Sequence, residues 1–409
     1  MKYAIIGNSA AAIGCVEGIR QVDREGEITL IASEPYHTYS RPLISYLLWG
    51  KTDEQRMKYR PDSFYADNGV KTMLGRTVTA VDPAARLLTL DDGEQLPYDR
   101  LMVATGSSAL VPPIPGLDEV KNRFSFMTLD DAKALEAALT PDSRVLIMGA
   151  GLIGLKCAEG IADKAGSLTV VDLADRVLPS ILDKEAAAMV QSHLEARGIR
   201  FILGDKAARF TASSAVLESG AEVPFDLLAV CVGVRPNTGL VSAAGGEVRR
   251  GIVTDDLCRT TLTDIYAGGD CTESFDITAG QNRILALLPN AYMQGECAGV
   301  NMAGGEKHYL HAIPMNAIGF FGLHMLTAGS CDGEAFVSSG EGWYKKLVVK
   351  DGLLRGFILL GDVARAGIYT ALIRDQRPLD ELDFDLIREK PQLMAFSRAD
   401  REQMLSRSH

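Results

Sequence analysis

A glycine-rich turn near the middle of the chain has the spacing of a nucleotide-binding loop. Its three glycines, and the two residues between the second and third of them, are Gly149, Gly151, Leu152, Ile153 and Gly154. An apolar run, 145–148, precedes the turn, and a helix to about Ala162 is expected to follow it. Such glycines permit a tight turn, close approach of the backbone to a pyrophosphate, and close packing of helix on strand. Because a helix start favours an anion, we predict a dinucleotide site here.

An acidic residue follows this turn at the distance that suits a ribose. Asp172 ends the apolar run 168–172, about 20 residues after the first glycine. A carboxylate in this place accepts hydrogen bonds from the 2′-hydroxyl of adenosine and repels the 2′-phosphate of NADP. The pattern favours NAD(H), but the cation Arg176 follows closely, so a firm choice between NADH and NADPH is left open.

The N-terminus repeats this architecture with fewer glycines. An apolar run, 2–6, leads into a loop and a predicted helix, and the loop residues are Gly7, Asn8, Ser9, Ala10, Ala11 and Ala12. Ser9 and Ala12 stand where the second and third glycines would be, and both are small enough for the loop to fit a phosphate. Glu34, after the run 27–31, is the candidate ribose acceptor. The alternative is a turn that only connects a strand to a helix.

Two such loops in one chain indicate two different nucleotides. NADH delivers electrons as a pair, whereas a flavin accepts a pair and releases the electrons singly. We therefore predict FAD at one loop and NAD(H) at the other.

Composition excludes several other classes of function. The 409 residues are 47% hydrophobic, which is ample for packed cores, and the net charge of −11 opposes binding to nucleic acid. No apolar run approaches the roughly 20 residues that span a bilayer, and the chain starts without a secretory signal, so a cytoplasmic protein is expected. The seven cysteines are scattered without zinc, iron–sulfur or CxxC spacing, and no metal site is expected.

The alternation of strand-like and helix-like runs is typical of the α/β class with parallel sheets. The predicted domains are a discontinuous FAD-binding domain at 1–112 and 234–305, an NAD-binding domain at 113–233, and a C-terminal α+β interface domain at 306–409. The first two are expected to be Rossmann-like, and a proline-rich break at 111–116 separates them. In the third, Asp351-Gly352 predicts a hairpin, a helix is expected at about 364–374, and the last thirty residues suggest further helices.

Further segments complete a set of motifs that resembles one family. The residues Ala104, Thr105 and Gly106 end one apolar run, Gly233 ends another, and the stretch 265–270 closes with Gly269 and Asp270. Together with the two loops, in order and spacing, these segments resemble the FAD-dependent pyridine nucleotide-disulfide oxidoreductase superfamily over about residues 1–303. The resemblance implies its fold and its two cofactors.

The resemblance also implies roles for single residues. Asp270 would bind the ribityl chain of FAD, the 104–106 segment would pass the FAD pyrophosphate and flavin, and the backbone at Val78 would reach the adenine. The helix that begins near Pro289 and Asn290 would aim its positive end at the flavin. Further cofactor residues implied in this way are Arg41, Pro42, Gly233 and Gly269.

The stretch 38–45 separates this chain from part of the family. Disulfide reductases keep cysteines there, whereas this stretch has none, so electrons cannot reach a disulfide by thiol exchange. The motif looks like that of NADH:rubredoxin reductases, ferredoxin reductases, the flavin-binding part of nitrite reductases, and flavin subunits of ferredoxin-linked 2-oxoacid dehydrogenase complexes.

Tyr46 and Lys156 stand where oxygenase-type reductases usually carry a lysine and a glutamate that pair beside the flavin. By the resemblance, Lys156 would put a cation near flavin N5 and raise the flavin potential. The alternative is an exposed helical lysine. Lys156 and Tyr46 are the candidate catalytic residues.

The predicted function is electron transfer between NAD(H) and a one-electron protein carrier of the rubredoxin or ferredoxin type. The protein would act alone, as a homodimer, or as the NAD-reactive subunit of an iron–sulfur complex. Because such carriers are acidic, a basic patch would be needed, and the two candidates are Arg56, Lys58 and Arg60, and Lys345 with Lys346. The alternatives are a reductase of quinone, peroxide, oxygen or disulfide, and a non-catalytic module that responds to NADH. The identity of the carrier and the direction of electron flow are left open.

Overall fold

In the computed structural model, which describes residues 1–406, the chain forms two compact units. The first comprises Met1–Glu273 and Leu288–Tyr309, and the second comprises Ser274–Leu287 and Leu310–His409. The segment 274–287, which the sequence analysis assigns to the FAD-binding domain, thus groups with the C-terminal unit. The further division of the first unit into an FAD lobe and an NAD lobe stays a prediction.

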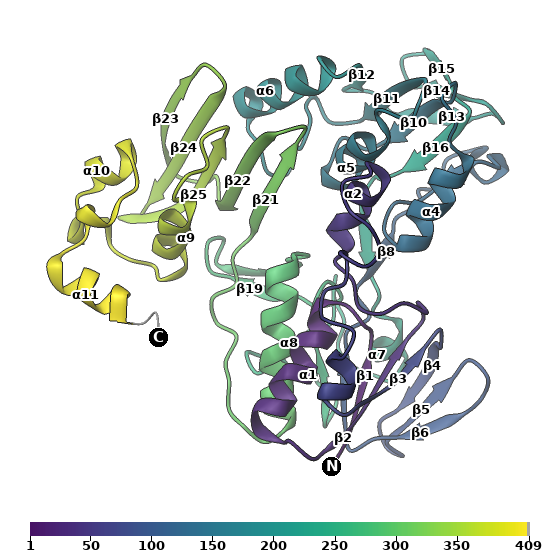
Figure 1. Ribbon diagram of the computed structural model, residues 1–409, viewed down its shortest axis with the longest axis vertical. Coiled ribbons are helices and arrows are strands. Elements are labelled where there is room, and N and C mark those ends of the chain that lie inside the picture. Colours follow the sequence, from purple (N-terminus) through teal and green to yellow (C-terminus); the bar gives the residue numbers. More distant parts are fainter. Residues whose placement is uncertain (407–409) are drawn as a thin grey trace. The chain divides into compact units, whose positions relative to one another are not determined.

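A five-stranded parallel sheet forms the first half of the first unit (Figure 1). Its strands, in sheet order, are β18 (Ile265–Ala267), β7 (Arg100–Val103), β1 (Lys2–Ile6), β2 (Glu27–Ala32) and β3 (Val70–Leu74). Helices α1 (Ala10–Val22) and α8 (Leu288–Met302) pack against one face, and a small antiparallel sheet, β4 (Val78–Asp82), β5 (Leu87–Leu90) and β6 (Gln95–Pro97), contributes to the core of the other. Short helices α3 (Phe64–Asp67) and α7 (Gly239–Ala243) complete this part. The predicted strands and helices are confirmed here.

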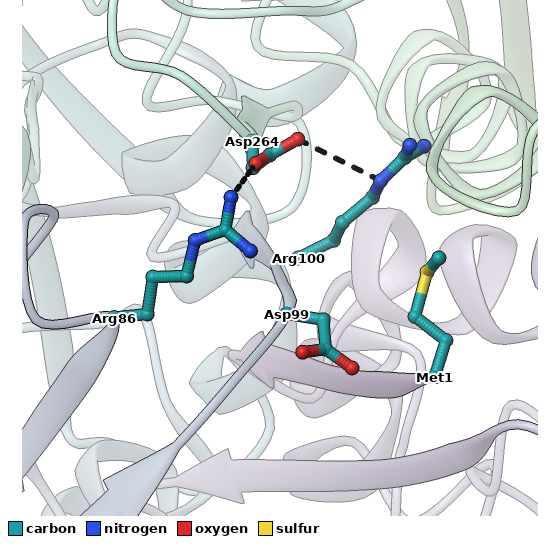
Figure 2. Close-up of a pocket in the computed structure, with 5 residues that line it drawn as sticks. All are labelled: Met1, Arg86, Asp99, Arg100 and Asp264. Atoms are coloured by element: carbon teal, nitrogen blue, oxygen red, sulfur yellow. Dashed lines mark hydrogen bonds and ion pairs between the residues drawn. The ribbon is translucent and has the colours of Figure 1, made fainter.

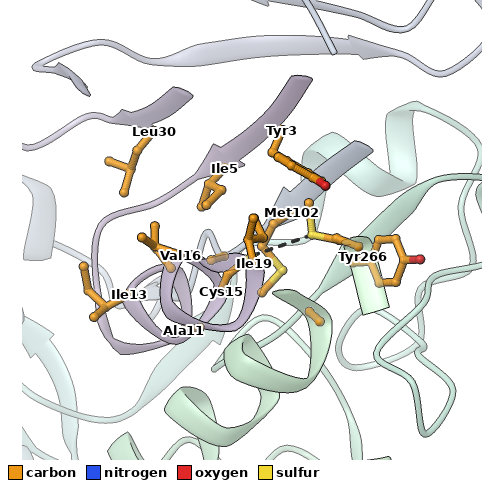
Figure 3. Packing of buried hydrophobic residues seen from close by; sticks show 14 of the residues in the cluster. Tyr3, Ile5, Ala11, Ile13, Cys15, Val16, Ile19, Leu30, Met102 and Tyr266 are labelled. Atoms are coloured by element: carbon orange, nitrogen blue, oxygen red, sulfur yellow. Dashed lines mark hydrogen bonds between the residues drawn. The ribbon is translucent and has the colours of Figure 1, made fainter. Parts of the chain in front are cut away.

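Strand β1 is buried on both faces because successive side chains of a strand point in opposite directions. Tyr3 and Ile5 join the apolar cluster around α1 and α8, as Figure 3 shows. Ala4 and Ile6 join the cluster on the other face. A near-continuous apolar run is what a central parallel strand requires.

Helices α1 and α8 contact each other backbone to backbone. A Cβ added to Gly14 would lie 2.3 Å from the Tyr292 carbonyl oxygen, and one added to Gly295 would lie 1.9 Å from that of Ala11. Gly18 and Gly299, one turn further along each helix, are equally close to the partner helix. Since the contacts advance together along both helices, the helices run parallel, and their N-termini lie at the same end of the sheet.

A second five-stranded parallel sheet forms the other half of this unit. Its strands, in sheet order, are β12 (Ile199–Leu203), β11 (Ser167–Asp172), β10 (Arg144–Met148), β16 (Leu227–Val230) and β9 (Arg123–Phe124). It is accompanied by helices α4 (Leu129–Ala138), α5 (Leu152–Ile161) and α6 (Lys184–Glu195), and by the antiparallel strands β13 (Ala207–Phe210), β14 (Ser214–Leu217) and β15 (Glu222–Pro224). The apolar runs at 145–148 and 168–172 are confirmed as strands β10 and β11.

The chain passes between the two halves twice, along paired strands. Strand β8 (Ser107–Ala109) leads out of the first half and β17 (Val234–Pro236) leads back, and the two pair antiparallel. Each crossing strand is therefore stabilised by hydrogen bonds to the other. The proline-rich segment 111–116 follows β8.

The second unit is α+β, as predicted. Its antiparallel sheet has the order β21 (Met315–Phe320), β22 (Leu323–Gly329), β25 (Leu353–Leu360), β24 (Trp343–Lys350) and β23 (Glu334–Gly340). Strands β24 and β25 form the predicted hairpin, with positive φ at Asp351 (54°) and Gly352 (70°). Helices α9 (Ala366–Arg374), α10 (Phe384–Glu389) and α11 (Arg398–Ser406) follow, and β19 (Ser274–Asp276) and β20 (Gln281–Arg283) form a separate hairpin. The prediction for the last thirty residues extends to 407–409, outside the described residues.

Within residues 1–406, no helix combines the length and the apolar character needed to cross a bilayer.

Replacing Gly295 by alanine tests the α1–α8 contact. The added Cβ would force the two helices apart, and such overpacking costs about 1–3 kcal/mol. We expect Gly295→Ala to lower the midpoint of urea unfolding, measured by far-UV circular dichroism. The matched control is Gly367→Ala on α9, where a Cβ meets open space, so this variant should be unchanged or slightly stabilised. Equal midpoints for Gly295→Ala and the parent would contradict the contact.

Candidate functional site

The pocket in Figure 2 is not at the nucleotide-binding edge of the first sheet. It is lined by Met1, Asp99, Arg100 and Asp264, which lie at or near the starts of β1, β7 and β18, and by Arg86, which precedes β5. Arg100 Nη1 donates to the carbonyl oxygens of Asn301 (2.9 Å) and Met302 (2.8 Å), and thereby ties the end of α8 to the sheet. Ligands of open α/β sheets bind at the opposite edge, where the strands end. This pocket is therefore a structural cluster.

Residues from three distant segments meet at the edge where the strands end. Gly7, which follows β1, lies against Ala104, which follows β7, so closely that a Cβ would be 2.2 Å from the Ala104 carbonyl oxygen. Gly269, which follows β18, lies beside Ala11 of α1 and Ala291 of α8, with a Cβ at 3.2 and 3.6 Å from theirs. The N-terminal loop is thus brought together with the predicted 104–106 and 269–270 segments.

The first loop is held from both sides. Asn8 Nδ2 donates to the Tyr36 carbonyl oxygen (3.1 Å), and Tyr65 donates its hydroxyl hydrogen to Asn8 Oδ1 (2.7 Å). Ser9 is the N-cap of α1, and its side chain makes no capping hydrogen bond. The N–H groups of Ala10, Ala11 and Ala12 start the helix, where an anion is favoured.

Glu34 belongs to a network with two residues that follow it. Tyr39 donates its hydroxyl hydrogen to Glu34 Oε2 (2.6 Å), and Arg41 forms an ion pair with Glu34. Arg41 also donates to the Met127 carbonyl oxygen (3.1 Å), and the Leu129 N–H donates to the Tyr39 hydroxyl (3.0 Å). The candidate ribose acceptor is therefore fixed in place and already shares its charge with Arg41. Pro42 lies beside Arg41 in the short 3-10 helix Arg41–Leu43.

Asp270 is a carboxylate in a weakly solvated place. Burial raises the pKa of Asp270, whereas a hydrogen bond from Ser107 Oγ (3.3 Å) and the charge of Arg41 act in the opposite direction. Further hydroxyl donors would stabilise the charged form. Hydroxyl groups are what a ribityl chain offers, so the arrangement fits the predicted role.

An asparagine that the sequence analysis missed locks the 104–106 segment. Asn237 Nδ2 donates to the Thr105 carbonyl oxygen (2.9 Å), the Thr105 hydroxyl donates to the Asn237 carbonyl oxygen (2.7 Å), and the Asn237 N–H donates to the Gly106 carbonyl oxygen (2.9 Å). Gly106 and Gly233 both have positive φ, 62° and 130°, and both adjoin open space. In the sequence, Asn237 is marked only by its place directly after residues 234–236, along which the chain returns to the first half.

The glycines of the second loop have the three expected geometries. Gly149 has φ 107°, and a Cβ there would lie 2.3 Å from the Cys231 carbonyl oxygen. A Cβ at Gly154 would lie 1.9 Å from the Gly149 carbonyl oxygen, whereas Gly151, the N-cap of α5, adjoins open space. Turn, close packing and room for an anion are therefore all present. Leu152 and Ile153 form the first turn of α5.

Asp172 lies at the end of β11 and is oriented by the backbone. Its Oδ2 accepts the Ala150 N–H of the glycine loop (2.6 Å), and its Oδ1 accepts the Ala174 N–H (2.7 Å). Arg176 is engaged elsewhere, with Asp175 (2.8 Å) and the carbonyl oxygens of Leu182 and Pro179. The cation that left the nucleotide choice open is therefore occupied, and the carboxylate favours NAD(H).

Tyr46 and Lys156 contact each other across two helices. Lys156 Nζ lies 4.2 Å from the centroid of the Tyr46 ring, which belongs to α2 (Ile44–Leu48). Lys156 also forms an ion pair with Glu159 one turn later on α5, and the side chains are 12% and 2% exposed. The alternative of an exposed helical lysine is therefore wrong. Glu159 was not among the predicted site residues, although its spacing from Lys156 on one helix was an available signal.

The remaining predicted residues lie near the same edge or on the small sheet. Val78 is the first residue of β4, paired with Leu90, and is buried. Pro289 and Asn290 lie in the first turn of α8, and Asn290 is buried.

The predicted basic patches do not present free cations. Arg56 pairs with Asp53 (3.4 Å), Lys58 with Asp62, and Arg60 with Glu17 (2.7 Å). In the second unit, Lys345 donates to the Glu389 carbonyl oxygen, and burial lowers the pKa of Lys345. The first group is therefore compensated by acids, whereas Lys345 in the second is held by a backbone carbonyl oxygen.

The family model of the pyridine nucleotide-disulphide oxidoreductases matches residues 1–295. This chain belongs to that family. One relative, the NADH-dependent phenylglyoxylate dehydrogenase subunit epsilon of Aromatoleum evansii, is 32% identical over 394 residues, with 93% of each chain covered. Another, the rubredoxin-NAD(+) reductase of Pseudomonas putida, is 31% identical over 310 residues, which cover 74% of this chain and 80% of that protein. The chain also spans about half the length (48%) of each of two further curated relatives.

The fold has close counterparts among solved structures. The crystal structure of the covalent putidaredoxin reductase–putidaredoxin complex matches with a TM-score of 0.88, covering 100% of this chain and 99% of that chain at 22% identity. At this identity the similarity shows the fold alone. Two Rossmann-like domains followed by an α+β domain are therefore established for this pyridine nucleotide-disulphide oxidoreductase.

As a pyridine nucleotide-disulphide oxidoreductase, the protein uses FAD and NAD(H). The residues present fit both cofactors, because open space adjoins Gly151 at one helix start and Asp270 lacks full solvation at the other loop. Asp172 would hold the nicotinamide nucleotide. Glu34, Arg41 and Asp270 would hold FAD.

Replacing Asp172 tests the nucleotide preference. Loss of hydrogen bonds to a charged acceptor costs about 1.5–3 kcal/mol, so Asp172→Ala should raise the KM for NADH about 10- to 100-fold and leave the KM for NADPH unchanged or lower. The measurement is steady-state reduction of ferricyanide with each nucleotide. Asp142→Ala, which changes an exposed acid just before the start of β10, is the control and should behave like the parent. An unchanged ratio of kcat/KM for the two nucleotides would contradict the assignment.

Proposed function

We propose that the protein transfers electrons between NAD(H) and a one-electron protein carrier of the iron–sulfur or rubredoxin type. The observation that carries this proposal is the pair of nucleotide loops, joined by two crossing strands, together with the lack of a cysteine in residues 38–48. The segment 38–45 and helix α2 contain no cysteine, and the nearest ones along the chain, Cys15 and Cys157, are both fully buried. A disulfide relay has no nucleophile there.

In this proposal the chain's residues bind and orient the two nucleotides, and none of them is assigned to donate a proton. The first turn of α5 and the space at Gly151 hold the nucleotide pyrophosphate, and Asp172 holds its ribose. The first turn of α1, with Arg41 between Glu34 and Asp270, binds the second dinucleotide. Bound there, FAD would supply the conversion between the electron pair of NADH and single electrons. Parallel helices α1 and α8 direct two positive ends to that place, which favours negative charge there.

Relatives support a protein as the partner. One relative is named as a subunit of an NADH-dependent dehydrogenase and another as a rubredoxin-NAD(+) reductase. We infer that this chain works in the same way, either with a separate carrier or as a subunit of a larger complex. Since Arg56, Lys58 and Arg60 are each paired with an acid, docking at that group is expected to depend on shape and local charge rather than on long-range attraction.

A comparison of electron acceptors tests the proposal. With NADH and without oxygen, rubredoxin or ferredoxin should give a kcat/KM at least tenfold above that for menadione, hydrogen peroxide or an aromatic disulfide. Faster turnover with a small acceptor would replace the proposed function with a small-acceptor reductase. No turnover with any acceptor would favour a non-catalytic module.

A loop variant assigns the entry point of the electrons. Gly151→Asp puts a carboxylate into the open space of the second loop, where it repels a pyrophosphate. This variant should lose reduction by NADH and keep reduction of the bound flavin by dithionite. The matched control is Gly239→Asp on α7, which also faces open space and should keep both. Normal reduction of Gly151→Asp by NADH would contradict the assignment of that loop.

A further inference from the structure

A buried amide on α8 contacts the turn that precedes Asp270. Gln294 lies in the second turn of α8 and is only 3% exposed. An unpaired amide in such a place would cost free energy, because its oxygen and its nitrogen both lose water. Both ends of the Gln294 amide therefore need partners inside the protein.

Three hydrogen bonds form a closed ring around Gly269. The Gly269 N–H donates to Gln294 Oε1 (2.8 Å), and Gln294 Nε2 donates to Thr272 Oγ1 (3.0 Å). The Thr272 hydroxyl donates to the Gly269 carbonyl oxygen (2.8 Å). Because the Gly269 N–H needs an acceptor, the ring fixes which end of the amide faces Gly269. Both polar backbone groups of Gly269 are thus held by buried side chains.

The turn at Gly269 is also packed tightly against the two long helices. Its φ is 85°, and a Cβ there would lie 3.2 Å from the Ala11 Cβ of α1. The preceding residue, Gly268, packs on Gln294 itself, with an added Cβ at 3.1 Å from the Gln294 Cβ. Packing and hydrogen bonds therefore fix the backbone from which the next residue, Asp270, extends.

The Asp270 side chain has few other contacts that could orient it. Among the described residues, its carboxylate accepts one direct side-chain hydrogen bond, a long one of 3.3 Å from Ser107 Oγ. Arg41 acts on this carboxylate through its charge. Since hydrogen bonds weaken steeply as their geometry worsens, a small rotation of the backbone at Gly269 would misplace the carboxylate for a ligand hydroxyl.

We propose that Gln294 is a positioning residue, which holds the Gly269 peptide so that the Asp270 carboxylate faces the hydroxyl groups of a bound polyol chain, the ribityl chain of FAD. The inference rests on the proposed function for the presence of FAD at this edge of the first sheet. Glutamine suits this place because its amide is an acceptor toward Gly269 and a donor toward Thr272 at once. A glutamate would offer only acceptors and would add a second negative charge near Asp270.

A double-mutant cycle separates this role from a general role in packing. Gln294→Leu keeps a side chain of similar size but removes both hydrogen bonds. It should raise the dissociation constant of FAD about tenfold, the scale of one lost hydrogen bond to a charged group. In the Asp270→Ala background, the same substitution should change that constant less than about twofold. The readout is the rise of flavin fluorescence when each holoprotein is diluted.

The matched control is Gln21→Leu, which removes an exposed glutamine of α1 that also hydrogen-bonds to α8, at Glu296 (2.8 Å), and should leave the dissociation constant unchanged. An equal rise in both backgrounds would overturn the proposal, because Gln294 would then act on the fold and not through Asp270. An unchanged constant in Gln294→Leu would overturn it too. If Gln294→Leu does not fold, Thr272→Val opens the same ring and should raise the constant in the parent but not in Asp270→Ala.

The dilution assay contains neither NADH nor a protein carrier. Failure of the carrier assay, with the expected coupling between Gln294 and Asp270, would therefore reject the proposed function alone. Unchanged FAD binding in Asp270→Ala would overturn the positioning role and leave the result of the carrier assay standing.

Discussion

The site depends on the close approach of helices α1 and α8. Their backbones touch at glycine positions, such as Gly14 and Gly295, where any side chain would separate them. This approach lets two long parallel helices begin at the same edge of one sheet. Both positive helix ends then lie beside Gly269, and the acid that follows it, Asp270, is in a weakly solvated place. Side-chain packing alone at a normal interhelical distance would not bring these termini together.

The paired strands β8 and β17 connect the two sites. Strands β8 and β17 carry the chain away from the first sheet and back, and Asn237 joins the returning strand to Thr105 and Gly106. The 104–106 segment, which is expected to pass the flavin, is therefore held by hydrogen bonds to Asn237, the residue that follows the returning strand. A change at Asn237 would therefore reach the 104–106 segment directly.

Charged residues at the junctions are arranged in compensated groups. Glu34 shares its charge with Arg41, and Lys156 shares its charge with Glu159 under the ring of Tyr46. Because each of these charges has a partner of opposite charge, its burial costs less free energy, and the pairing fixes where the charge lies. The overall net charge of −11 therefore says little about the field at the site. The local pairs decide that field.

The sequence by itself determined the two loops, the parallel sheets, the α+β C-terminal part and the family, because glycine spacing and strand periodicity are local properties. The burial of Lys156 could not be predicted because Tyr46, which covers it, lies on another helix, and Asn237 was missed because its partners, Thr105 and Gly106, are distant in the sequence. The same limit explains the failed basic patches: Arg60 is neutralised by Glu17, which is distant in the sequence. Which side chains share a charge, and which helices may touch, was decided only by the tertiary structure, since these contacts join segments whose spacing along the chain carries no signal.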